Sequence, residues 1–169
     1  MQRNIIKSAM INGLIMGGLF SLNFLLSISK NTSLILLSYG IAIIIIVTMY
    51  KMSVRYRDGE CEGAISYGKS FSYVLLTFFY AALISTVVKY IYFQYINPEY
   101  LNQMFQESMK MMEVMKLPID DNSISQMESM MKPASFSFIY IWSNLFLGVI
   151  VGLIMAAFVK KDKSIFTQQ

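Results

Sequence analysis

One segment of the chain has the spacing of a phosphate-binding loop. Residues 63–70 read Gly-Ala-Ile-Ser-Tyr-Gly-Lys-Ser, which fits the pattern G-x-x-x-x-G-K-[ST]. Such a loop binds nucleotide phosphates when it follows a buried strand and opens a helix. Here residues 55–62, before the loop, are charged and contain glycine, and a long apolar segment follows it. We therefore predict that the motif binds no nucleotide, and that Gly68 and Lys69 turn the chain into a membrane with Lys69 at the lipid headgroups.

Methionine is the second residue type that could do chemistry. The chain has fourteen methionines, and their thioether sulfurs are soft ligands that suit Cu(I). Eight of them lie between residues 97 and 133: Met104, Met109, Met111, Met112, Met115, Met127, Met130 and Met131. Ligand type alone gives no coordination geometry, so a copper site is the less favoured interpretation of this cluster.

Other catalytic groups are scarce. The chain has no histidine and one cysteine, Cys61, which excludes an imidazole base, an internal disulfide and an all-protein zinc site. Cys61 stands between Glu60 and Glu62, whose charges disfavour a reactive thiolate. No base and nucleophile stand at motif spacing. We expect no enzyme activity, no metal site and no cofactor.

The composition points to a protein embedded in a membrane. Hydrophobic residues make up 56% of the 169 residues and charged residues only 14%, whereas a soluble domain has about 25% charged residues. The apolar residues form blocks of about 20, the length of a transmembrane helix. We predict an all-α, four-helix transmembrane bundle that forms a single domain over residues 1–169. The predicted spans are 8–29, 32–50, 70–96 and 134–159.

The lysines and arginines predict the orientation of these spans. Four spans place both termini on one side, and nine basic residues fall there: Arg3, Lys7, Lys51, Arg55, Arg57, Lys69, Lys160, Lys161 and Lys163. Four fall on the other side: Lys30, Lys110, Lys116 and Lys132. This bias predicts that both termini are cytoplasmic. The basic charge then reflects topology and lipid headgroups, and not nucleic acid. Lys89 ends the third span among aromatic residues, where we expect its side chain to snorkel toward the headgroups.

The long connection at residues 97–133 is too charged to span and has helical periodicity. We predict an extracytoplasmic amphipathic helical hairpin there, with Asn97-Pro98 opening its first helix and a capping box at 123–126 opening its second. Apolar residues on one side of the first helix form the candidate interaction face: Leu101, Met104, Phe105, Met109, Met112 and Met115. This face is expected to lie on the membrane or on a partner, because flexible methionines suit irregular apolar surfaces.

Small residues predict where the spans approach each other. Gly13 and Gly17 form one small-xxx-small ridge in the first span, and Gly148 and Gly152 form another in the fourth. We expect the two ridges to pack against each other in preference to mediating dimerisation. Three asparagines inside the spans are expected to form interhelical hydrogen bonds: Asn12, Asn23 and Asn144.

Three stretches carry a resemblance to a known family. They are residues 56–60 continuing to 65–71, the end of the third span at 90–96, and Asn97-Pro98-Glu-Tyr-Leu101. Together they resemble the bacterial integral-membrane family known as domain of unknown function 4199. The resemblance implies a four-span inner-membrane protein with an extended loop between the last two spans, and it implies no activity. The chain departs from the expected pattern with Asn97 where an acidic residue would precede Pro98, and with an insert around Cys61.

Three hypotheses for the function follow. The leading one is a non-enzymatic structural or accessory membrane protein whose hairpin binds the lipid bilayer or an envelope protein partner. The second is a small transporter or channel, which needs a homo-oligomer because four spans enclose little space. The third is Cu(I) handling by the methionine cluster.

Overall fold

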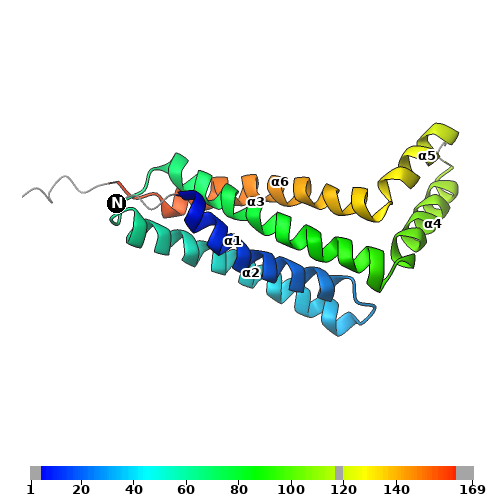
Figure 1. Ribbon diagram of the computed structural model, residues 1–169, viewed down its shortest axis with the longest axis horizontal. Coiled ribbons are helices and arrows are strands. Elements are labelled where there is room, and N and C mark those ends of the chain that lie inside the picture. Colours follow the sequence, from blue (N-terminus) through cyan, green and yellow to red (C-terminus); the bar gives the residue numbers. More distant parts are fainter. Residues whose placement is uncertain (1–4, 117–119, 163–169) are drawn as a thin grey trace, which may run out of the picture. The chain divides into compact units, whose positions relative to one another are not determined.

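The computed structural model describes residues 5–116 and 120–162, and its regular elements there are helices (Figure 1). Arg3 and Lys163, which the charge count includes, lie outside these ranges. The elements in chain order are α1 (Ile5–Ser27), α2 (Thr32–Glu60), α3 (Tyr67–Ile91), the π-helix η1 (Tyr92–Ile96), α4 (Glu99–Val114), α5 (Asp121–Met130) and α6 (Pro133–Val159).

Four of these segments are long and apolar enough to cross a membrane, namely α1, α2, α3 with η1, and α6. The predicted all-α class is therefore confirmed. The helix bounds differ from the predicted spans. Helix α2 continues ten residues beyond Tyr50, because a helix keeps its own backbone hydrogen bonds after it leaves the apolar segment. Helix α3 begins at Tyr67, three residues before the predicted start.

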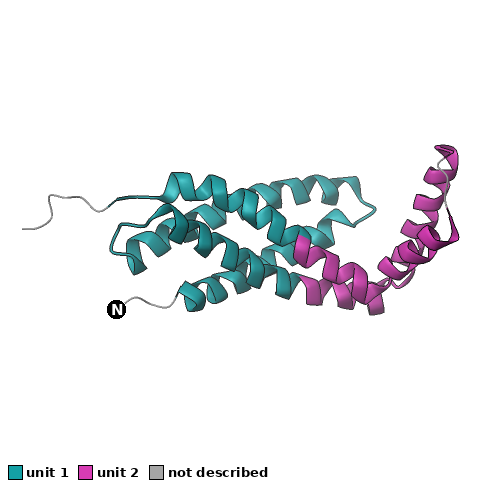
Figure 2. Cartoon of the chain, turned by 90° about the horizontal axis from the view of Figure 1, so that it is seen from above, with its two compact units in different colours: residues 1–85, 143–169 teal, residues 86–142 magenta. Residues whose placement is uncertain are grey.

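The chain divides into two compact units (Figure 2). Unit 1 comprises residues 1–85 and 143–169, and unit 2 comprises residues 86–142. Both boundaries fall inside helices, one in α3 and one in α6. Unit 1 contains most of the buried apolar side chains, with Met16, Met49, Tyr73, Val74 and Phe78 fully enclosed.

Both glycine ridges pack against α3, and not against each other as the sequence suggested. A Cβ on Gly13 would lie 2.5 Å from the Cβ of Tyr80, and one on Gly17 would lie 2.7 Å from the Cβ of Ile84. From α6, a Cβ on Gly148 would lie 2.8 Å from the Cβ of Phe78. Gly152 likewise faces the Phe71 ring. Helix α3 fills both ridges because its bulky side chains complement the missing Cβ atoms.

Two of the predicted asparagine hydrogen bonds are confirmed. The amide of Asn12 donates to the hydroxyl of Tyr73 over 2.6 Å, which joins α1 to α3. The amide of Asn23 donates to the backbone carbonyl of Ser38 over 2.7 Å, which joins α1 to α2. Each bond satisfies a polar group within an apolar segment, where an unpaired amide would be costly.

A short connection closes unit 1 after α2. Cys61 ends α2 as a buried free thiol, and Gly63 adopts a φ of +78°, which glycine tolerates without steric cost. Ile65 then pairs with Lys161 through two backbone hydrogen bonds of 2.9 and 3.0 Å. The Arg57 guanidinium donates to the carbonyl of Val159, so the end of α2 is also attached to the end of α6.

The hairpin helices of unit 2 begin differently from the prediction. Pro98 is the residue that precedes α4, and the Asn97 side chain donates to the Tyr92 hydroxyl and does not cap α4. The backbone N–H of Asn97 donates to the carbonyl of Tyr92, and this hydrogen bond ends η1 before α4 begins. Helix α5 is capped by Asp120, which accepts hydrogen bonds from Ser123, and not by Ser123 itself. Asp120 directly precedes α5, and aspartate is among the residues most often found at the N-cap.

Candidate functional site

The predicted interaction face of α4 is divided between a groove and an exposed end. Leu101 is buried, and Met104, Phe105, Met109 and Met112 are half-buried. A groove of about 440 Å³ runs between α4 and α5, lined by Leu101 and Phe105 on one side and by Ile124 and Met131 on the other. Part of the face therefore lines this groove, and the rest lies outside it.

The end of α4 carries the exposed part of the apolar surface. Met111 and Met115 are each 64% exposed, and Val114 is 82% exposed. We call these three residues the hairpin patch. The predicted interaction face contains Met115 of this patch, but not Met111 or Val114. Spacing along the helix did not predict how exposed each of these side chains is.

Lys89 lies at one end of a chain of packed aromatic rings in unit 2. The ammonium of Lys89 lies 3.9 Å from the centre of the Tyr140 ring, a cation–π contact. Tyr140 packs on Phe136, Phe136 on Phe93, and Phe93 on Tyr100, with ring centres 5.4 to 5.7 Å apart. Lys89 is only 5% exposed. The expected snorkelling is therefore wrong: the side chain lies against an aromatic face of the protein.

The segment that matches a phosphate-binding loop has no strand before it. Helix α2 ends at Glu60, two residues separate it from Gly63, and Gly68 and Lys69 lie in the first turn of α3. The backbone N–H of Lys69 donates to the hydroxyl of Ser66, as in an ordinary helix start. This geometry lacks the strand and open amide loop that phosphate binding by this motif requires.

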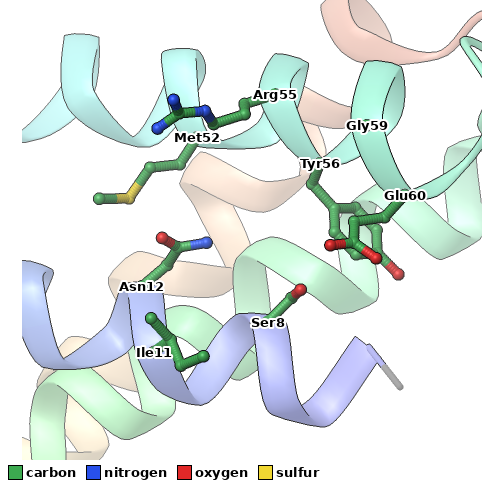
Figure 3. Close-up of a pocket in the computed structure, with 8 residues that line it drawn as sticks. All are labelled: Ser8, Ile11, Asn12, Met52, Arg55, Tyr56, Gly59 and Glu60. Atoms are coloured by element: carbon green, nitrogen blue, oxygen red, sulfur yellow. The ribbon is translucent and has the colours of Figure 1, made fainter. Parts of the chain in front are cut away.

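The structure also has a pocket with polar lining residues between α1 and α2 in unit 1, which the sequence did not predict. This pocket has a volume of about 360 Å³. Figure 3 shows Ser8 and Asn12 pointing from α1 toward α2, and Tyr56 and Glu60 pointing from α2 toward α1. The remaining lining residues are Ile11, Met52, Arg55 and Gly59. The only sequence signal was the 4-residue spacing of Ser8 with Asn12 and of Met52 with Tyr56 and Glu60, which places each set on one helix face.

Tyr56, which lines this pocket, packs against Tyr73 of α3. Their rings stack 4.2 Å apart at an angle of 5°. Tyr73 also accepts the hydrogen bond from Asn12, so one residue ties the pocket wall to both α1 and α2. Arg55, by contrast, is exposed, and no salt bridge or hydrogen bond of its guanidinium occurs within the described residues.

In the described part of the chain, no group of three or more His, Cys, Asp or Glu residues could hold a metal ion. That finding does not concern thioether ligands. The methionines on and just after α4 extend over about three turns, from Met104 to Met115.

The fold defines a multi-pass α-helical membrane protein. Its four long apolar helices expose large apolar side chains that water would disfavour and lipid would accommodate, including Leu14, Ile43, Phe146 and Phe158. Residues 11–161 match the family described as protein of unknown function (DUF4199), and the chain belongs to that family. No curated protein and no solved structure matches the chain.

Proposed function

We propose that this chain is a non-enzymatic accessory protein of the bacterial inner membrane whose hairpin binds another envelope protein through the hairpin patch. The observation that carries the proposal is the exposure of Met111, Val114 and Met115 at one end of a helix whose other apolar residues are buried or half-buried. Three adjacent apolar side chains exposed on a helix with many charges are typical of a binding surface.

The charge of the hairpin favours a protein partner over the lipid surface. Residues 97–133 contain six carboxylates and three lysines, a net charge of −3. Helices that lie on bacterial membranes are usually rich in lysine and arginine, because the lipid surface is anionic. The acidic hairpin would be repelled by that surface, whereas a basic or neutral protein would meet no such cost.

The test is crosslinking in cells followed by purification of the intact chain in mild detergent. The triple variant Met111→Ser, Val114→Ser, Met115→Ser should lose a partner that the unaltered chain retains. Phe105 is left unchanged, because it lines the groove between α4 and α5 and its loss would disturb the hairpin itself.

A matched control changes three exposed polar residues of the same helix: Gln103→Ser, Glu107→Ser and Lys110→Ser. This control keeps the net charge and should retain the partner. Equal retention by both variants would contradict the proposal. A homo-oligomer with no other protein attached would favour a transporter or channel instead, and detachment of the hairpin from vesicles in the triple variant would favour lipid.

A further inference from the structure

The pocket between α1 and α2 lies where the polar layer of a membrane is expected. The apolar segment of α2 ends near Tyr50, and its pocket residues run from Met52 to Glu60. On α1 the pocket begins at Ser8, the first residue of the predicted span. At about 1.5 Å of rise per residue, Met52 and Arg55 lie about 3 and 7.5 Å beyond Tyr50, within a headgroup layer of about 5 to 8 Å. Glu60 lies about 15 Å beyond Tyr50, on the water side of that layer.

The end of unit 1 that holds the pocket is basic. Helix α1 starts there, α2 ends there, α3 starts there and α6 ends there. The described residues at this end include seven cations and four carboxylates. The cations are Lys7, Lys51, Arg55, Arg57, Lys69, Lys160 and Lys161. The carboxylates are Asp58, Glu60, Glu62 and Asp162. Arg57 is paired with Asp58 at 2.7 Å, whereas the Arg55 fork is open to a phosphate.

The two charged side chains of the pocket stand at different ends of it. Arg55 and Glu60 are five residues apart on α2, which is about 7.5 Å of helix rise, and Figure 3 shows them toward opposite ends of the pocket. A ligand with two negative groups would meet Glu60. A ligand with one negative and one positive group would complement both residues.

The apolar part of the pocket is at its rim. Ile11 is 49% exposed and Met52 is half-buried, and both line the pocket. Ile11 continues along α1 into the exposed apolar residues Leu14 and Ile15. An acyl chain could therefore run from the pocket along the apolar surface of α1 without exposing carbon to water.

We propose that this pocket binds the headgroup of a zwitterionic phospholipid of the phosphatidylethanolamine type. The phosphate pairs with the Arg55 guanidinium, the ammonium approaches the Glu60 carboxylate, and the chains leave past Ile11 and Met52. The stacked pair Tyr56 and Tyr73 keeps the pocket wall in place before the lipid arrives.

Native mass spectrometry of the full chain, delipidated in mild detergent, tests this site. The probes are phosphatidylethanolamine, phosphatidylglycerol and inorganic phosphate. The unaltered chain should retain phosphatidylethanolamine in preference to phosphatidylglycerol. Arg55→Gln should weaken that binding by about tenfold, since a hydrogen bond to a charged group is lost. Glu60→Gln should remove the preference between the two lipids.

Lys51→Gln is the matched control, because Lys51 is an exposed cation of the same helix that does not line the pocket. It should leave binding unchanged. Arg55→Lys keeps the positive charge but loses the two-pronged guanidinium, so this variant should bind phosphatidylethanolamine at an intermediate level. It replaces Arg55→Gln in the test if Arg55→Gln does not fold. Equal loss in Lys51→Gln, equal retention of both lipids by the unaltered chain, or phosphate binding that depends on Arg55 without any lipid would overturn the proposal.

Discussion

At Asp120 one carboxylate makes both of the side-chain contacts that begin α5. It accepts hydrogen bonds from the backbone N–H of Ser123 at 3.3 Å and from the Ser123 hydroxyl. These bonds stabilise the ionised form, so the pKa of Asp120 lies below the usual carboxyl range, with the hydroxyl bond as the main cause. A side-chain hydrogen bond of this kind joins residues close together in the sequence, and it sets the residue at which the helix starts.

The lowered pKa predicts how the start of α5 depends on pH. The cap stabilises the helix fully above the ordinary carboxyl pKa, and this stabilisation is lost as the pH falls through the lower folded-state value. An NMR titration of the Asp120 carboxyl carbon in the full chain should give a higher midpoint in Ser123→Ala than in the unaltered chain. Ser125→Ala, whose hydroxyl bonds to the carbonyl of Asp121, is the control and should not move it. Identical midpoints in all three proteins would refute this account.

At the scale of elements, α3 is the helix on which the others in unit 1 pack. Gly13 and Gly17 of α1 and Gly148 and Gly152 of α6 each leave room for α3 side chains. The neighbouring Gly18 has open space where a Cβ would be. Two adjacent glycines of one helix thus have opposite surroundings, and only Gly17 belongs to the small-xxx-small ridge that the sequence contains.

This difference predicts opposite effects of the same substitution. Gly17→Ala would place a Cβ 2.7 Å from that of Ile84 and should destabilise the chain by about 1 to 3 kcal/mol through overpacking. Gly18→Ala should be neutral or stabilise by up to about 1 kcal/mol, because alanine favours the helix and meets no neighbour. Thermal unfolding in one detergent measures both. Equal midpoints for the two variants would mean that α1 does not pack on α3 in this way.

At the scale of the whole molecule, charge separates along the chain. Residues 97–133 carry a net charge of −3, whereas the whole chain carries +4. The rest of the chain therefore carries the excess of lysine and arginine. In a multi-pass protein this excess predicts that the termini and the connection after the second span stay on the cytoplasmic side. The chain also divides into two compact units, and α4 and α5 both belong to unit 2.

The predicted orientation can be tested with a membrane-impermeant thiol reagent in a Cys61→Ser background. Gln103→Cys, exposed on α4, should react in intact cells. Asp162→Cys, exposed after α6, should react only after the membrane is made permeable. Labelling of both sites, or of Asp162→Cys alone, from outside intact cells would contradict the orientation.

The sequence by itself determined the class of this protein and the existence of its helices. Blocks of about 20 uncharged residues must satisfy their backbone groups internally in lipid, so their helical form follows from length and composition. The periodicity of residues 97–133 likewise predicted two helices there, and the structure has α4 and α5 in that segment.

Only the tertiary structure decided which faces of these helices meet. It made α3 the neighbour of both glycine ridges, buried Lys89 beside Tyr140, and divided the methionine face into a groove and the hairpin patch. It also joined Asn12 and Tyr56 in one pocket wall. Periodicity marks a face as small, polar or apolar, but its partner depends on complementary shapes on segments far apart in the chain, which composition and spacing do not encode.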